Sequence, residues 1–170
     1  MSARWLTTAS ATDMAPWLTF WNELVFPFWT DNLEAVISEG EPPQTIYEWF
    51  DEEPERWEVA QRGFRAVASI IVDEVTTKVD IPGGATRLLD VGGGHGLFAI
   101  ELCRDRSDLS ATIFDNPHAL AAARTAITGA GVDGRVDVLG GDYWTDDLGT
   151  GYDVALVFNL IHAHTHEENR

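Results

Sequence analysis

The sequence has very little cysteine. Cys103 is the single one, so no disulfide can form within the chain. This is typical of a reducing compartment, and we expect a cytoplasmic protein with Cys103 in its core. Apolar runs are also short: none approaches the roughly 20 residues that a membrane helix needs. The amino terminus lacks a basic segment followed by an apolar stretch. We therefore expect neither a membrane span nor a secretion signal.

Basic residues are scarce as well. The chain has 11 Lys and Arg against 28 Asp and Glu, which gives a net charge of −17. Residues 1–84 carry 15 acidic and 5 basic side chains, and residues 85–170 carry 13 and 6, so the acidity is not confined to a tail. A strongly negative surface repels phosphate backbones, and nucleic acid is therefore not an expected partner. With 45% hydrophobic residues, the 170-residue chain can still bury a core.

The first half of the chain has helical periodicity. Apolar side chains at positions 17, 20, 21, 24, 25 and 28 predict a helix over residues 13–29, which Pro27 should kink or end. Further helices are predicted at 32–38, closed by Gly40, near 46–50, and at 55–78 after Pro54. Residues 81–84 (IPGG) are the expected boundary. We therefore divide the chain into a helical segment, 1–84, and a second domain, 85–170.

The second half alternates strands and helices. Strands are predicted at 86–91, 109–115, 135–139 and 152–159. Helices are predicted at 96–105 and at 117–127, the latter capped by Asn116, and another begins at 165. This alternation predicts an α/β fold with a parallel, doubly wound sheet. Ligands of such sheets bind at the carboxyl ends of the strands.

A glycine turn follows the first of these strands, in the sequence LLDVGGGHG. Its glycines, from Gly92 to Gly96, allow backbone to approach a ligand, and the free N–H groups of the next helix attract polar groups. The dinucleotide pattern G-x-G-x-x-G fails because Leu97 stands at the third glycine, which disfavours an NAD-dependent dehydrogenase. A nucleotide-like cofactor is the favoured interpretation, and a purely structural turn is the alternative.

Two acids follow later strands. Asp115 ends an apolar strand and could accept hydrogen bonds from both ribose hydroxyls of a nucleoside, or instead cap a helix. Asp142 lies in the sequence GGDYW. Its carboxylate could accept from the amine of adenine, with Tyr143 or Trp144 stacking nearby, or simply shape a turn.

These segments together resemble a known family. LLDVGGGHG, IFDNP, RVDVLGGDYW and YDVALVFNLIHAHTHEE are similar to class I S-adenosylmethionine-dependent methyltransferases. More narrowly, they resemble the small-molecule O-methyltransferases that include plant caffeate and bacterial polyketide enzymes. The resemblance covers residues 85–170, and 13–80 more loosely. It implies a Rossmann-like sheet, S-adenosyl-L-methionine as the cofactor, a hydroxyl of a small aromatic molecule as the acceptor, and a homodimer at full length. Methylation of nitrogen or carbon would use the same donor site and stays open.

The resemblance also implies roles for single residues. Gly92, Gly93 and Gly94 match the motif near the methionine moiety, and Asp115 matches the acid that holds the ribose. Asp142 matches the acid beside adenine, with Tyr143 at a position that is usually hydrophobic. His162 matches the histidine that acts as general base on the acceptor hydroxyl. The family's Asp-Trp pair after this histidine is missing, which points to bacterial relatives with a histidine-rich segment.

His162, His164 and His166 follow the last strand closely. Imidazole can take a proton near neutral pH, which suits a general base at His162. The spacing would place all three on one face only in an extended segment, so a zinc site is the weaker alternative and no metal is predicted. A surface histidine is the remaining interpretation.

The chain carries four predicted strands, whereas the family's sheet resembles a seven-stranded one. The family's winged-helix dimerisation domain is also missing. We therefore expect a fragment, with an open sheet edge and uncovered apolar surface that make the isolated piece unstable or prone to aggregate. Trp21, Phe26 and Trp29 could line an acceptor pocket or pack internally. A non-catalytic module of this fold, used for dimerisation or binding, is the alternative function.

Overall fold

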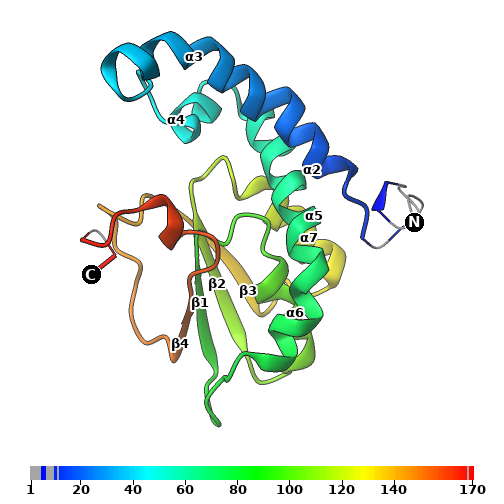
Figure 1. The fold of residues 1–170 in the computed structure, drawn as a ribbon. Helices are drawn as coiled ribbons and strands as arrows, with labels where there is room; N and C mark the ends of the chain where they lie inside the picture. The colour runs from blue at the N-terminus through cyan, green and yellow to red at the C-terminus, as the bar shows by residue number, and fades with distance from the viewer. Residues whose placement is uncertain (1–4, 7–9, 11, 168) are drawn as a thin grey trace. The chain divides into compact units, whose positions relative to one another are not determined.

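The computed structural model describes residues 5–6, 10, 12–167 and 169–170. Its contacts divide the chain into two compact units, Met1–Ile70 and Ile71–Arg170. The division falls within the long helix α5 (Pro54–Lys78), drawn in green and cyan-green in Figure 1. The predicted helix at 55–78, with Pro54 at its start, is thereby confirmed. The division into domains 1–84 and 85–170 stays a prediction.

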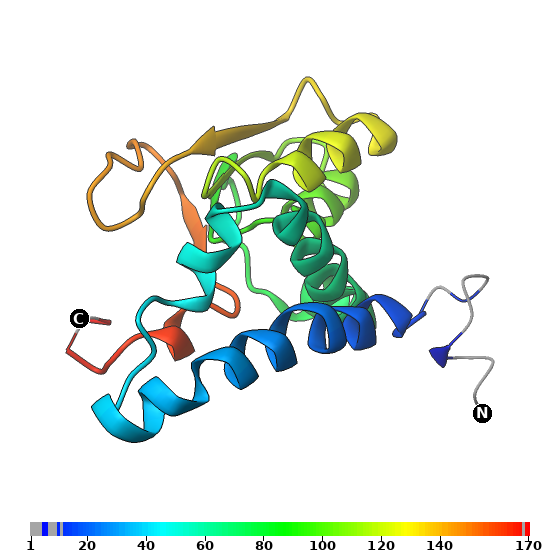
Figure 2. The same ribbon diagram turned by 90° about the horizontal axis from the view of Figure 1, so that it is seen from above.

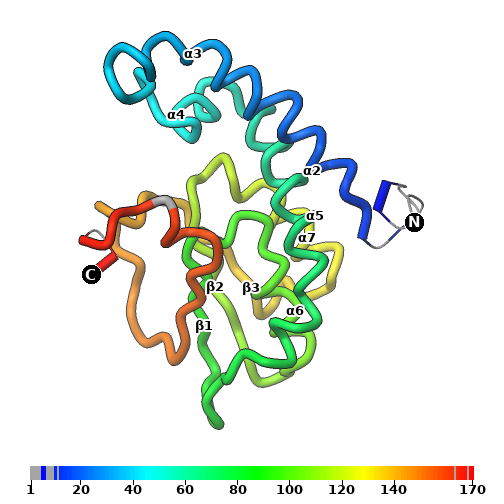
Figure 3. Tube along the Cα trace, viewed as in Figure 1, coloured from blue at the N-terminus to red at the C-terminus, as the bar shows by residue number. Residues whose placement is uncertain are grey.

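The first unit begins with one continuous helical run, which the trace in Figure 3 follows in blue. It consists of α2 (Ala15–Phe20), a π-helical turn η1 (Trp21–Val25) and α3 (Phe26–Glu39). The prediction that Pro27 ends a helix, with a separate helix at 32–38, is wrong, whereas a kink at this position stays a prediction. The backbone N–H of Phe26 bonds to Trp21 O, five residues back, and Pro27 then stands in the first turn of α3, where a missing N–H is tolerated. Gly40 ends the run at φ 93°, as predicted.

Two further elements complete this unit. Helix α4 (Ile46–Asp51) starts with a capping box, in which Thr45 Oγ1 accepts from the Glu48 N–H at 3.1 Å and the Glu48 carboxylate accepts from the Thr45 N–H at 2.7 Å. The core is aromatic, with the rings of Phe50 and Trp57 5.3 Å apart in an edge-on arrangement. A Cβ on Gly63 would lie 2.7 Å from the Cβ of Phe20, so this glycine lets α2 lie close to α5.

The second unit contains a four-stranded parallel sheet. Its strands are β1 (Arg87–Val91), β2 (Ser110–Asp115), β3 (Val136–Gly140) and β4 (Val154–Leu156), in the order β3-β2-β1-β4. Helix α6 (Leu97–Asp105) connects β1 to β2, and α7 (Ala121–Ala130) connects β2 to β3. Because β4 returns to the other side of β1, the carboxyl ends of β1 and β4 flank the switch point. The predicted doubly wound α/β fold is confirmed.

Three predicted boundaries in this unit are wrong. Asn116 does not cap α7: it closes a turn in which its Oδ1 accepts from the His118 N–H at 2.9 Å, and the helix starts at Ala121. Strand β4 has three residues in place of the predicted eight, because it pairs with β1 only along Leu88–Asp90. After it the described residues form a 3₁₀ turn, η2 (Ile161–Ala163), and not the helix expected from 165; Glu168 lies outside the described residues.

The two faces of the sheet are covered differently. Helices α6 and α7 pack on β2 and β3 and lie together to one side of the strands in Figure 1. The long loop between β3 and β4, orange in Figure 2, arches out on the side away from α7. On that face Leu89, Val91 and Phe114 form a buried group, the Phe114 cluster. Loop side chains pack against this cluster, namely Tyr143, Leu148, Tyr152 and Leu160.

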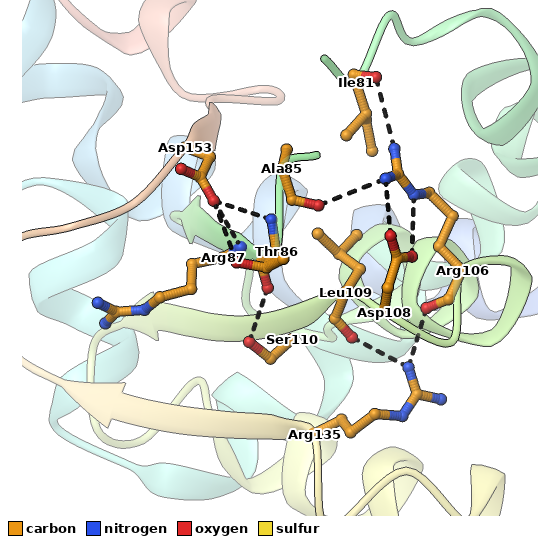
Figure 4. A network of polar contacts seen from close by, with 10 residues as sticks. All are labelled: Ile81, Ala85, Thr86, Arg87, Arg106, Asp108, Leu109, Ser110, Arg135 and Asp153. Atoms are coloured by element: carbon orange, nitrogen blue, oxygen red, sulfur yellow. Dashed lines mark hydrogen bonds and ion pairs between the residues drawn. The ribbon is translucent and has the colours of Figure 1, made fainter. Parts of the chain in front are cut away.

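The amino ends of the strands are tied together by polar side chains (Figure 4). The Asp153 carboxylate accepts from the N–H groups of Thr86 at 2.8 Å and Arg87 at 3.0 Å, and these bonds lower its pKa. The guanidinium of Arg135 donates to main-chain carbonyls at the end of α6 and at the start of β2, those of Cys103, Arg106 and Leu109. These contacts hold the end of the sheet that lies opposite the glycine turn. Among the described residues, no helix combines the length and the apolar character that crossing a membrane requires.

Candidate functional site

The glycine turn lies at the carboxyl end of β1 and is held by β2. The N–H groups of Gly92 and Gly93 both donate to Phe114 O, at 2.8 and 3.3 Å. Gly92 and Gly94 have φ angles of 68° and 34°, in the region that favours glycine. A Cβ on Gly93 would lie 2.7 Å from Asp90 Cγ, so a larger residue there would displace the Asp90 side chain. The turn therefore has no side chain at positions 92–94, where Gly92 and Gly93 are half-buried and Gly94 is buried.

Asp115, at the end of β2, links the carboxyl ends of β1, β2 and β3. Its Oδ2 accepts from the Gly94 N–H at 2.7 Å, and its Oδ1 accepts from the Asn116 N–H at 2.7 Å. Its main-chain oxygen accepts from the Gly141 N–H at 3.0 Å, which attaches the loop that follows β3. Asp115 does not cap α7, so the helix-cap alternative is wrong. A carboxylate oxygen has two lone pairs, so each Asp115 oxygen can accept one further hydrogen bond.

Burial raises the pKa of Asp115 to about 6, against the two N–H donors, which lower it. When a carboxylate is partly desolvated, its ionised form is stabilised by any additional hydrogen-bond donor or positive charge that a ligand brings. Asp115 therefore holds the glycine turn in place and can also accept hydrogen bonds from a ligand.

Asp90 is a site residue to which the sequence reasoning assigned no role. Its side chain is 2% exposed, and its Oδ2 has no hydrogen-bond partner among the described residues. Burial, and then the charge of Asp115, raise its pKa to about 7, while a bond from the Ala99 N–H lowers it. An acid inside an apolar strand, directly before a glycine turn, was the signal that could have identified it. Two carboxyl groups thus lie at the turn, and a cationic ligand would stabilise their ionised forms.

Asp142 and Tyr143 begin the loop after β3. The Asp142 carboxylate is exposed and accepts from the Trp144 N–H at 2.9 Å and the Thr145 hydroxyl at 3.1 Å. The alternative that Asp142 shapes a turn is confirmed, and its contact with adenine stays a prediction. Tyr143 is half-buried against the Phe114 cluster, and its hydroxyl lies 2.9 Å from His164 Nε2.

His162 lies in the η2 turn and is exposed. The histidine that contacts the neighbouring loop is His164, which sequence reasoning mentioned only as part of the cluster. Among the described residues, no group of three or more His, Cys, Asp or Glu side chains gathers as metal ligands would. The three histidines therefore do not share a common centre in this part of the chain.

The structure brings most of the predicted residues to one edge of the sheet. Gly92, Gly93, Gly94 and Asp115 are joined directly, and Gly141 attaches the loop that carries Asp142 and Tyr143. The segment after β4 reaches the same edge, because a Cβ on Gly92 would lie 3.3 Å from the methyl carbons of Leu160. Figure 3 shows this red segment passing over the upper, carboxyl end of β1. His162 is part of that segment.

The chain is similar to known proteins. Residues 33–170 match the family model of the O-methyltransferase domain. The 3-hydroxy-5-methyl-1-naphthoate 3-O-methyltransferase of Streptomyces sahachiroi is 32% identical over 150 residues, which are 85% of this chain and 42% of that protein. The mitomycin biosynthesis 6-O-methyltransferase of Streptomyces lavendulae is 25% identical over 158 residues, 92% of this chain and 44% of that protein. The chain thus spans less than half the length of these two relatives.

Solved structures show the same fold. The crystal structure of LaPhzM superposes with a TM-score of 0.82 at 21% identity, over 96% of this chain and 50% of that chain. An O-methyltransferase from neocarzinostatin biosynthesis, in complex with S-adenosyl-L-homocysteine and 1,4-dihydroxy-2-naphthoic acid, gives a TM-score of 0.79 at 21% identity. That match covers 94% of this chain and 50% of the other.

Proposed function

This chain belongs to the O-methyltransferase domain family, and from that premise we propose that the protein transfers a methyl group from S-adenosyl-L-methionine to a hydroxyl of a small aromatic molecule. The observation that carries the proposal is the 2.7 Å bond from the Gly94 N–H to Asp115, which joins the glycine turn to the acid of the next strand. The aromatic acceptor is supported by the naphthoate in the name of one relative and by the dihydroxynaphthoic acid bound in one structural neighbour.

The residues at this edge fit the proposed cofactor. Each Asp115 oxygen can accept one more hydrogen bond, which matches the two neighbouring hydroxyls of a ribose. The positive φ angles at Gly92 and Gly94 form a tight turn without side chains, which is the backbone proposed to lie beside the methionine moiety. The carboxyl groups of Asp90 and Asp115 favour the positive charge of a sulfonium. Tyr143 offers an aromatic ring at the loop proposed to hold adenine.

S-adenosyl-L-methionine supplies an activated methyl group when bound, so the chain's own task is to orient the acceptor and receive a proton. We assign proton removal to His162: its imidazole nitrogen takes the proton of the acceptor hydroxyl, the O–H bond breaks, and its electron pair stays on the oxygen, which becomes the better nucleophile. Exposure of His162 in the η2 turn leaves its ring accessible to an acceptor.

Asp115→Asn tests the cofactor assignment. The change removes the charge that strengthens the ribose hydrogen bonds, so affinity for S-adenosyl-L-homocysteine should fall by about 2 kcal/mol, roughly thirtyfold, in titration calorimetry. Asp137→Asn, at an exposed position of β3, is the matched control and should leave the affinity unchanged. Equal affinities in wild type and Asp115→Asn would contradict the ribose assignment.

His162→Asn tests the proposed general base. Transfer of labelled methyl to 1,4-dihydroxy-2-naphthoic acid, and to a panel of simple phenols, should fall about a hundredfold or more, while S-adenosyl-L-homocysteine still binds. His166→Asn, at an exposed position four residues further along the same segment, is the control. Binding of the cofactor by wild type without transfer to any acceptor would favour the non-catalytic module instead.

We also propose that the protein forms a homodimer through the first helical run. Six large apolar side chains are exposed along it, namely Leu18, Trp21, Phe26, Trp29, Leu33 and Ile37. The π turn inserts the extra residue that keeps Trp21 and Phe26 on one face. Contiguous exposed apolar surface marks an interaction site. Ile37→Glu, at a side chain that is 77% exposed, should shift a dimer to monomer in light scattering, and an unchanged mass would contradict this interface.

The working environment is part of the proposal. Cys103, the one thiol of the sequence, is fully buried and unpaired, which supports a reducing compartment such as the cytoplasm. The net charge of −17 supports action on small molecules and not on nucleic acid. Retention of the protein on heparin or on DNA at physiological salt would contradict the second point.

A further inference from the structure

We propose that His164 is a positioning residue: through its hydrogen bond to Tyr143, it makes the placement of His162 depend on the loop that holds the methyl donor. This inference rests on the proposed function, because it concerns the same site. It goes beyond that function by assigning a role to a second histidine, which does not touch the reacting atoms, and by coupling donor binding to the proposed base.

The segment that carries His162 has a defined shape. It leaves β4 through Asn159, whose φ of 52° lies in the left-handed region that asparagine tolerates better than most residues. The η2 turn then presents His162 at its middle position. The side-chain amide of Asn169 donates to Ile161 O at 2.8 Å and to Thr165 O at 3.0 Å, on either side of His162. These two bonds connect the residues on both sides of His162, so we treat residues 161–165 as one unit.

One end of this unit lies on the glycine turn. Leu160 packs against the Phe114 cluster, and its methyl carbons lie 3.3 Å from the Cβ position of Gly92. This contact is apolar, as is that of the neighbouring Phe158 with Phe98, whose ring centroids lie 4.6 Å apart, so neither gives the turn a directional attachment. A second attachment is needed to define where the His162 ring points.

His164 supplies that second attachment. Its Nε2 lies 2.9 Å from the Tyr143 hydroxyl, and its ring meets the Trp144 ring edge-on with centroids 4.9 Å apart. Tyr143 directly follows Asp142, in the loop proposed to hold adenine. His162 thus lies between a contact to the glycine turn on one side and a contact to the adenine loop on the other.

This arrangement predicts coupling between the donor and the base. A donor that orders the loop at Tyr143 also orders His164, and with it the η2 turn. Coupling of this kind is reciprocal, so fixing the η2 turn should also favour donor binding. The hydrogen bond is the directional part of the link, and its removal should loosen His162 without removing the residues that contact the donor.

Hydrogen–deuterium exchange with and without S-adenosyl-L-homocysteine tests the inference. In wild type, amides of residues 92–97 and of residues 159–165 should both gain protection when the ligand is added. In Tyr143→Phe and in His164→Phe, residues 92–97 should still gain protection, while the gain at 159–165 should fall roughly two- to tenfold, the loss expected for one hydrogen bond. The double variant should lose no more than either single one, and His164→Gln should restore much of the gain.

His166→Phe is the matched control, because it changes an exposed histidine of the same segment. Where transfer is measured, His164→Phe should lower kcat by the same roughly two- to tenfold and leave the affinity for the donor nearly unchanged. Full protection of residues 159–165 in both single variants would overturn the inference while leaving the proposed function intact. No protection of residues 92–97 in wild type would overturn the proposed function, and the inference with it.

Discussion

Replacing Asp90 by asparagine should remove a pH dependence from the stability of the protein. The carboxyl group is 2% exposed, its Oδ2 has no partner among the described residues, and its pKa is raised from 3.8 to about 7. Because one pKa unit corresponds to about 1.36 kcal/mol, ionised Asp90 destabilises the folded state by about 4 kcal/mol relative to the unfolded chain. Asparagine has the same shape, cannot ionise, and keeps an oxygen for the Ala99 N–H.

The free energy of unfolding depends on pH because the folded protein binds the Asp90 proton more tightly than the unfolded chain does. Between pH 4 and 7 the folded protein keeps a proton on Asp90 that the unfolded chain has released, so the free energy of unfolding falls as pH rises through this window. Above pH 7 both states are ionised and this contribution is constant. The stability of Asp90→Asn relative to wild type should therefore increase by about 4 kcal/mol between pH 4 and pH 8 and then level off.

Urea unfolding followed by far-ultraviolet circular dichroism, at half-unit steps from pH 4 to 8.5, measures this difference. Asp137→Asn, at an exposed position of β3, is the control for a general loss of negative charge. Curves for wild type and Asp90→Asn that stay parallel across the range would refute the reasoning. They would mean that Asp90 ionises in the folded protein as easily as in water, in spite of its burial.

Three further predictions concern positions where the packing leaves no freedom. Gly93→Ala should lower the free energy of unfolding by about 1–3 kcal/mol, since its Cβ would lie 2.7 Å from the nearest side-chain atom, whereas Gly83→Ala, in open space, should be silent. Arg135→Met should destabilise by about 2–4 kcal/mol in the same unfolding assay because three main-chain carbonyls each lose a hydrogen bond from the guanidinium, and in the described part of the chain only that of Arg106 keeps a second donor, the Leu109 N–H. A loss no larger than that of exposed Arg124→Met would contradict this. Cys103, buried and with its pKa raised to about 11, should react with iodoacetamide only as the protein unfolds, and rapid labelling of the native state would be inconsistent with its burial.

Local patterns predicted most of the secondary structure. Apolar side chains at helical spacing identified α5, and short apolar runs identified β1, β2 and β3 to within two residues at each end. Such patterns are readable because they reflect which face of an element is buried. Predictions failed where a local rule met a competing contact: the π turn accommodates Pro27, and Asn116 closes a turn in place of capping α7.

The sequence by itself determined the parallel α/β plan, the glycine turn from Gly92 to Gly96, and the presence of an acid at the end of β2. These follow from the order of apolar runs, from glycine's conformational freedom and from the position of one residue relative to its strand. Only the tertiary structure decided that Asp115 bonds to Gly94, that Asp90 is buried without a partner for one oxygen, and that His164 lies against Tyr143. Both hydrogen bonds join residues 21 positions apart, and the burial of Asp90 depends on its neighbours in the sheet and in α6, so spacing along the chain gives no measure of these distances.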